Sequence, residues 1–263
     1  TKTIAEVTGG GGFYLFRTTD NSFYATGYNA QGQLGTGFFD SCSRLTPVAL
    51  PAGKNFVSAC GGRYSSVFLT DAGEMYSVGD SSSNQLGWGG SISVWTEPTP
   101  IAVNKSYFGD KTLLQLTGGR MHAVGLTTDG EVYTWGISNS SGQIGKGDLV
   151  PSTTPASIAN KGALAGKTIV AVAAGFSHTL ALTSEGQLVA WGDNSSGQLG
   201  VGSYTNSTVP VLVVGTPAMV GKRFCSVAAA GSVSVALSTD GKVFVWGKGS
   251  AGCMGNGSLA AST

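Results

Sequence analysis

Short apolar runs recur along the chain, and residues 168–191 show one complete set of them. Residues 168–175 (TIVAVAAG) are apolar nearly throughout, as expected of a strand that is buried on both faces. Residues 178–183 (HTLALT) alternate, and residues 187–191 (QLVAW) follow a turn at residues 184–186 (SEG), whose glycine accepts a positive φ. The pattern predicts three short antiparallel strands.

A glycine-rich stretch, residues 190–202 (AWGDNSSGQLGVG), comes after the third strand. A segment that contains proline follows it. Because proline is tolerated on an edge strand, residues 209–213 (VPVLV) predict a fourth, outer strand. Four short antiparallel strands in one unit, with no helical pattern, indicate the blade of a β-propeller.

This unit occurs five times. The Gly-x-Leu-Gly core of its glycine-rich corner recurs at steps of 52, 58, 55 and 55 residues, beginning at Gly32, Asn84, Gly142, Gly197 and Gly252. We therefore expect an all-β fold, a β-propeller of five visible four-stranded blades in a single domain that covers residues 1–263. The repeat units are expected near residues 1–51, 52–103, 104–165, 166–220 and 221–263.

The fourth unit carries a family resemblance. From Ala174 to Gly200 it reads A-G-x-x-H-T-x-A-L-T-x-x-G-x-L-x-x-W-G-x-N-x-x-G-Q-L-G, which resembles the regulator-of-chromosome-condensation repeat almost position for position. The resemblance covers the whole chain and is weaker in the first two units, where Thr26 and Val78 replace the tryptophan. The tryptophan column of the other units is Trp135, Trp191 and Trp246. Since members of that family resemble seven-bladed propellers, the five visible blades are expected to belong to a larger ring.

Closure of such a ring needs an explanation. The fifth unit stops before its proline-containing outer strand, and a propeller leaves no long bare sheet edge. Further repeats or a neighbouring subunit are favoured to cover this edge. A self-sealed ring is the alternative, and it would use a disulfide between Cys42 and Cys253, which lie near the same corner of the first and fifth units. Four cysteines leave the redox state open.

The composition narrows the classes of partner. Charged residues make up 11% of the chain and the net charge is +1, so no basic field attracts nucleic acid or anionic lipid. No apolar run approaches the roughly 18 residues of a membrane span. We expect no nucleic-acid binding and no membrane insertion.

The motifs that resemble catalytic or phosphate sites have structural interpretations. The glycine-rich corner could hold an anion through its N–H groups, but it recurs five times and no helix follows it. Residues 161–168 (KGALAGKT) miss the phosphate-loop spacing by one position. His122 and His178 share one repeat column and are expected to be buried or to bond a turn. We expect no enzyme activity, catalytic residue, cofactor, metal or small-molecule substrate.

Two tryptophans lie outside the repeated column. Trp88 and Trp95 occur in residues 87–95 (GWGGSISVW), a loop that is polar in the other units. Exposed aromatic residues are candidate contacts for a protein partner. A local packing role is an equally good interpretation.

Five N-x-[ST] sequons raise the question of the compartment. Asn139 and Asn194 belong to the corner motif, whereas Asn104 and Asn206 lie in loops outside it, and Asn256 is the fifth. Together with the scarce charge and the many serines and threonines, they favour an extracellular glycoprotein. A cytoplasmic or nuclear location is the alternative.

Three functions compete for this chain. We favour a non-enzymatic protein-interaction or structural module in a larger assembly, which binds a protein partner or further copies of itself. The family resemblance implies the second, a guanine-nucleotide exchange factor for a small GTPase. The third is a secreted enzyme inhibitor. Because propellers host many functions, fold alone does not choose among them.

Overall fold

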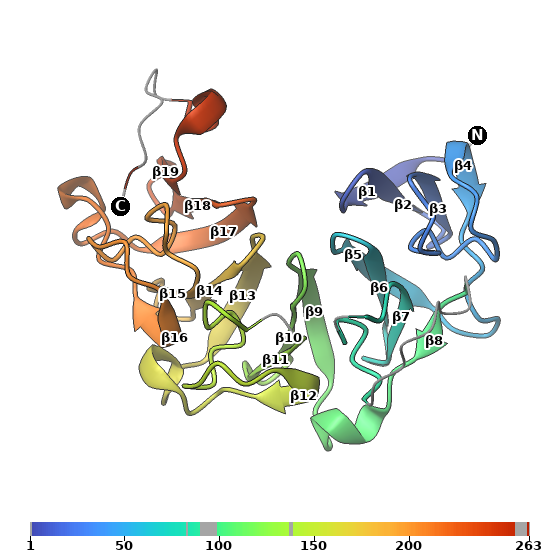
Figure 1. Ribbon diagram of the computed structural model, residues 1–263, viewed down its shortest axis with the longest axis horizontal. Coiled ribbons are helices and arrows are strands. Elements are labelled where there is room, and N and C mark those ends of the chain that lie inside the picture. Colours follow the sequence, from blue (N-terminus) through green and yellow to red (C-terminus); the bar gives the residue numbers. More distant parts are fainter. Residues whose placement is uncertain (1, 83, 90–98, 137–138, 256–261, 263) are drawn as a thin grey trace.

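The computed structural model describes residues 2–82, 84–89, 99–136, 139–255 and 262. It confirms an all-β propeller with five antiparallel blades. Figure 1 shows the blades side by side in an open arc, with the first strand of each blade nearest the centre. The first and fifth blades stand at the two ends of this arc.

Each blade is built from strands that are consecutive in the sequence. The first contains β1 (Ile4–Gly9), β2 (Phe13–Thr18), β3 (Phe23–Gly27) and β4 (Cys42–Pro47). The second contains β5 (Phe56–Gly61), β6 (Ser65–Thr70), β7 (Met75–Gly79) and β8 (Ile101–Ala102). The third contains β9 (Leu113–Gly118), β10 (Ala123–Thr127), β11 (Val132–Gly136) and β12 (Ser152–Ser157). The fourth contains β13 (Ile169–Ala174), β14 (His178–Thr183), β15 (Leu188–Gly192) and β16 (Ser207–Leu212). The fifth contains β17 (Phe224–Ala230), β18 (Val233–Ser238) and β19 (Val243–Gly247).

Short 3-10 helices interrupt the connections. Three of them lie between blades: η1 (Lys105–Phe108), η2 (Gly162–Leu164) and η3 (Pro217–Met219). A fourth, η4 (Ser250–Gly252), lies in the corner of the fifth blade.

The fifth blade contains the first position of an outer strand. Ser262 pairs with Gly247 in an isolated bridge. The outer strands of other blades begin in the same register, with Cys42 opposite Gly27, Ser152 opposite Gly136 and Ser207 opposite Gly192. Ser262 therefore occupies the place at which the outer strand starts.

The candidate disulfide is not formed. Cys42 and Cys253 are free, and each sulfur contacts backbone carbonyl oxygens of its own corner. The candidate Cys42–Cys253 bond, which the self-sealed alternative would use, is absent because the two residues belong to the blades at opposite ends of the arc (Figure 1). Cys60 and Cys225 are free as well, and burial raises the pKa of the Cys60 thiol to about 12.

Neighbouring blades are joined where the corner of one meets the tryptophan of the next. The indole Nε1 of Trp191, in the fourth blade, donates to the carbonyl oxygen of Gln143 in the third at 3.0 Å. A Cβ on Gly145 would lie 2.8 Å from the same indole ring, so the corner requires glycine there. The third and fifth blades repeat the hydrogen bond: Trp135 to Gln85 at 2.9 Å and Trp246 to Gln198 at 2.9 Å.

The junction between the first two blades uses a different donor. Val78 occupies the tryptophan position of the second blade, and no indole is present there. The hydroxyl of Ser66 donates to the carbonyl oxygen of Gln33 at 2.6 Å instead. The corner carbonyl is thus satisfied at each of these four junctions, as burial demands.

An asparagine folds the corner itself. The amide Nδ2 of Asn194 donates to the carbonyl oxygens of Ser203 and Thr205, and its Oδ1 accepts from the N–H of Leu199. Asn29 and Asn139 make the equivalent bonds. The apolar residue of each corner is fully buried: Leu34, Leu86, Ile144 and Leu199. These contacts confirm the structural interpretation of the glycine-rich stretch.

Replacement of Trp191 by phenylalanine tests the indole-to-carbonyl bond. The change removes the indole donor from the buried Gln143 carbonyl and removes ring volume, so we expect the free energy of unfolding to fall by about 2–4 kcal/mol. Trp88→Phe is the matched control, because the Trp88 Nε1 has no hydrogen-bond partner within the described part of the chain. The Trp88→Phe change should lower the free energy of unfolding, measured by urea denaturation, by less than about 1 kcal/mol. Equal losses for the two variants would show that the hydrogen bond does not hold the junction.

Candidate functional site

The antiparallel blades sort their loops onto two faces. The turn between the first and second strands of each blade and the glycine-rich corner between the third and fourth lie at the same end of the sheet. We call this end the corner face. The hairpin turns between second and third strands, and the connections between blades, form the hairpin face at the other end.

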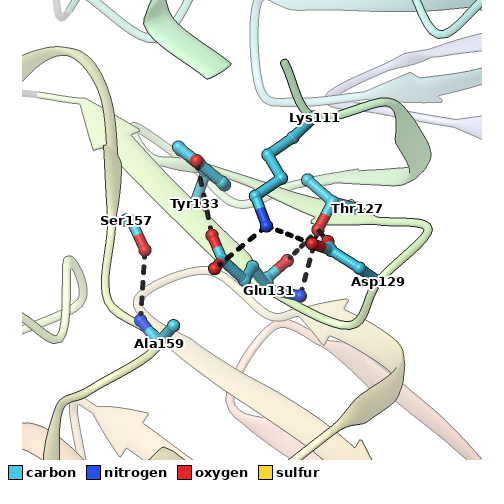
Figure 2. Close-up of polar contacts among 7 residues, drawn as sticks. All are labelled: Lys111, Thr127, Asp129, Glu131, Tyr133, Ser157 and Ala159. Atoms are coloured by element: carbon cyan, nitrogen blue, oxygen red, sulfur yellow. Dashed lines mark hydrogen bonds and ion pairs between the residues drawn. The ribbon is translucent and has the colours of Figure 1, made fainter. Parts of the chain in front are cut away.

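Five lysines on the hairpin face pair with carboxylates. Figure 2 shows the third blade, where the Nζ of Lys111 contacts the carboxylates of Asp129 and Glu131. The hydroxyl of Thr127 donates to Asp129 at 2.5 Å, and these two donors hold the pKa of the Asp129 carboxyl below its usual range. The other blades carry the pairs Lys2–Asp20, Lys54–Glu74, Lys167–Glu185 and Lys222–Asp240.

These ion pairs contribute little to stability because they are solvent-exposed and are screened by water and salt. They do have a chemical consequence. Lys167, the lysine of the stretch that resembles a phosphate loop, lies 2.5 Å from Glu185 and belongs to this structural column.

A depression lies on the corner face at the centre of the arc. Its volume is about 530 Å³, and the turns between first and second strands of all five blades line it. Arg63, Arg120 and Phe176 are the large side chains of its lining, and the remaining lining residues are glycine and alanine: Gly9, Gly10, Gly11, Gly61, Gly62, Gly118, Gly119, Ala174, Gly175, Ala229, Ala230 and Gly231.

Close approach of neighbouring turns explains the glycines. A Cβ on Gly11 would lie 2.3 Å from the carbonyl oxygen of Arg63 in the next blade. Backbone hydrogen bonds link the turns, from Arg120 N to Phe176 O at 2.9 Å and from Phe176 N to Gly231 O at 2.7 Å. The wall of the depression is therefore mostly backbone, with its N–H groups at these positions already engaged.

The two arginines of the depression occupy equivalent places in consecutive blades. Each follows a glycine pair and stands two residues before the column of Ser65 and His122. The Arg63 guanidinium lies over the ring of Tyr64 at 4.7 Å, an arrangement worth about 0.5–1 kcal/mol at an exposed site. No carboxylate lines the depression, and within the described residues neither arginine forms an ion pair.

The corner face also carries exposed apolar side chains, both in the depression and in the corner loops. Phe176 is 59% exposed at its edge. The corner loops add further exposed residues: Tyr28, Phe38, Phe39, Leu149, Val150 and Tyr204. The sequence prediction missed these residues and both arginines. The sequence feature that could have identified them is a large or charged side chain at a loop position where the other repeats have a small or polar residue.

The two tryptophans proposed as contacts have different outcomes. Trp88 is half-buried and packs against the core cluster that contains Met75 and Trp135, and its carbonyl oxygen accepts a hydrogen bond from the Tyr107 hydroxyl at 3.1 Å. The packing interpretation therefore fits Trp88. Trp95 lies outside the described residues.

The sequons separate by burial. Asn139 and Asn194 are 1% and 0% exposed, and their amide nitrogens are bonded to the corner, so these two candidate sequons are not accessible for a glycan in the folded protein. Asn104 and Asn206 are exposed. Asn256 lies outside the described residues.

The repeat histidines are buried between blades. The Nε2 of His122 lies 3.0 Å from the Thr179 hydroxyl, and that of His178 lies 2.9 Å from Ser234 Oγ. Since Ser234 donates its own proton to the Gln198 carbonyl at 2.7 Å, the His178 Nε2–H is the donor to Ser234. Their role is to join blades.

The described residues contain neither a metal-binding cluster nor a membrane-spanning helix. No group of three His, Cys, Asp or Glu side chains there is placed to hold a metal ion. No helix in that part of the chain has the length and apolar character to cross a membrane.

Comparison with known proteins identifies the repeats. Sequence models described as "Regulator of chromosome condensation (RCC1) repeat" match residues 20–69, 129–182 and 185–237, and a second model of that description matches residues 169–198.

Whole-chain comparisons agree with the repeat match. The chain is 35% identical over 236 residues to the Ultraviolet-B receptor UVR8 of Arabidopsis thaliana, which covers 89% of this chain and 50% of UVR8. It is 28% identical to the Secretion-regulating guanine nucleotide exchange factor of Bos taurus, over 96% of this chain and 53% of that protein. The crystal structure of Prp20p from Saccharomyces cerevisiae, described with its binding to Gsp1p and histones, superposes with a TM-score of 0.80 at 22% identity, over 98% of this chain and 61% of Prp20p. The chain thus spans about half the length of these curated relatives.

Acidification should destabilise the fold through the buried histidines. Burial lowers the pKa of His122 to about 3, with a smaller effect from the nearby His178, and burial lowers that of His178 to about 4. Because the folded pKa values lie below the unfolded value of about 6.5, the unfolded state binds more protons as the pH falls below 6.5. We expect each imidazole to lower the free energy of unfolding by about 1.4 kcal/mol for each pH unit below 6.5.

Urea denaturation between pH 7 and 4.5 measures this loss. The double variant His122→Gln/His178→Gln should show a much flatter dependence of unfolding free energy on pH. The window stays above the range in which the Asp240 carboxyl, with a pKa of about 2, contributes. Parallel pH profiles for the wild type and the double variant would contradict the assignment.

Proposed function

Because the chain belongs to the regulator of chromosome condensation (RCC1) repeat family, we propose that it is a non-catalytic protein-interaction module that binds its partner through the corner face. One observation carries the proposal. The corner face combines exposed apolar residues in its loops with a concave centre, whereas five lysines of the hairpin face are paired with carboxylates. Exposed aromatic residues around a depression are typical of protein interfaces.

Relatives support an interaction role. Prp20p binds Gsp1p and histones, and the RCC1-like propellers include receptors and exchange factors. These proteins share a fold on which different partners are recognised, so the family supports binding in general and leaves the partner to the variable loops.

A larger assembly is part of the proposal. In the fourth blade, β14 is buried at every position, whereas β18 of the fifth blade alternates between buried and half-buried positions. The difference arises because, among the described residues, one side of the fifth sheet has no further blade packed against it. Additional blades or another subunit would cover this apolar surface.

We place the protein outside the cell in this proposal. Two sequons, at Asn104 and Asn206, are exposed, and the paired, scarce charges suit a surface rich in hydroxyl and amide groups. An attached glycan at either asparagine would displace no core contact.

A guanine-nucleotide exchange factor is the second candidate. Similarity to the bovine Secretion-regulating guanine nucleotide exchange factor over 96% of this chain supports it. Release of a fluorescent GDP analogue from a panel of purified small GTPases tests it directly. If catalytic amounts of the chain accelerate GDP release, the chain is an exchange factor and the simple binding role is wrong.

Substitutions on the two faces test the binding proposal. We expect the triple variant Phe39→Ser/Leu149→Ser/Tyr204→Ser to recover at least tenfold less partner protein than the wild type. The measurement is quantitative affinity purification from an extract of the native source. Val220→Ser/Val243→Ser is the control, because both valines are exposed near hairpin-face loops. Equal recovery of every co-purifying protein by the wild type and the triple variant would refute a corner-face interface. Unchanged thermal unfolding would show that both variants fold.

Mass spectrometry of glycopeptides tests the extracellular location. Protein isolated from its natural source should carry a glycan at Asn104, Asn206 or both, and none at Asn139 or Asn194. The reason is that only the first two side chains are exposed. An intact mass equal to that of the bare polypeptide would argue against the secretory route and strengthen the exchange-factor alternative.

A further inference from the structure

We propose that the central depression of the corner face binds a carboxylate-bearing segment of a protein partner, with Arg63 and Arg120 contacting the acid and Phe176 contacting an adjacent apolar residue. The inference rests on the proposed corner-face function and specifies the chemistry of its partner. The residues that line the depression fit a peptide segment that carries an acidic residue beside an apolar one.

The charge of the depression is one-sided. Its two ionisable side chains are both arginines, no acid lines it, and no ion pair in the described part of the chain satisfies either guanidinium. On the hairpin face, by contrast, five lysines have carboxylate partners. The two guanidinium groups are therefore available to an acid from outside.

The shape of the depression selects an extended segment. Its volume of about 530 Å³ is within the usual range of ligand-binding pockets, roughly 300–1,000 Å³. Because glycine and alanine form most of its wall, a partner chain can approach the backbone closely. The N–H groups of Gly11, Arg120 and Phe176 already donate to neighbouring turns, so the guanidinium groups are the donors that remain for an anion.

Positioning of Arg63 strengthens the argument. Its guanidinium stacks on Tyr64, whose ring lies 6.2 Å from that of Tyr28. A side chain held in this way loses less conformational entropy on binding. Guanidinium groups bind carboxylates in a two-pronged geometry that lysine cannot reproduce.

A protein acid fits this site better than a nucleic acid or a lipid surface. The chain has a net charge of +1, and a nucleic-acid backbone would need a wider basic surface than two arginines. Phe176 at the edge, 59% exposed, adds an apolar contact that suits a peptide side chain.

A selection from a random library of displayed 12-residue peptides tests the inference with the whole chain as the target. We expect enriched peptides to contain Asp or Glu beside an apolar residue. Synthetic copies of the enriched peptides should bind at least tenfold more weakly when Asn or Gln replaces the acid. The double variant Arg63→Gln/Arg120→Gln should lose the same affinity, whereas Arg44→Gln/Arg223→Gln, a charge-matched control, should retain it.

The outcomes separate the inference from the proposed function. Failure to select acidic peptides, or equal binding to both double variants, overturns the carboxylate site. Tighter binding of oligo(dT) or of phosphatidylserine vesicles than of any peptide, lost in Arg63→Gln/Arg120→Gln, also overturns it in favour of a phosphate ligand. If partner recovery still depends on Phe39, Leu149 and Tyr204 in those cases, the corner-face function stands without this site.

Discussion

The hydrogen bond from a tryptophan indole of one blade to the corner carbonyl of the blade before it is the interaction on which the architecture depends. It joins segments 48–50 residues apart in the chain, as with Trp191 and Gln143 or Trp135 and Gln85. Because the indole lies against the last glycine of the corner, the bond fixes both the distance between blades and the path of the corner loop. The buried leucine or isoleucine of each corner then fills the space between sheets.

Between the fourth and fifth blades the same carbonyl is part of a longer network. His178 donates to Ser234, Ser234 donates to the Gln198 carbonyl, and Trp246 donates to that carbonyl as well. A buried network of this kind is stable only while every member keeps its protonation state. The two histidines, which are candidate catalytic residues by type, therefore contribute to the packing between blades.

Packing and recognition use separate positions of the same repeat. The columns that contact the next blade are chiefly glycine, glutamine, leucine, tryptophan and histidine, with exceptions such as Val78 and Ser65 in the second blade. The turn position two residues before the histidine column, and the tips of the corner loops, point away from these contacts. Arg63, Arg120 and Phe176 occupy that turn position in three consecutive blades. Substitutions there can alter the charge of the central depression without disturbing the contacts between blades.

The sequence by itself determined the strands, the hairpin turns, the five units and the structural role of the glycine-rich corner, because each depends on local periodicity that repeats five times. It also identified the buried tryptophan column. Only the tertiary structure decided which residues from different blades meet. The curvature of the arc keeps Cys42 away from Cys253, the corner buries Asn139 and Asn194, and the convergence of five turns at one axis brings Arg63, Arg120 and Phe176 to one depression. These outcomes follow from the angles between blades, which side-chain packing sets and which no single repeat contains.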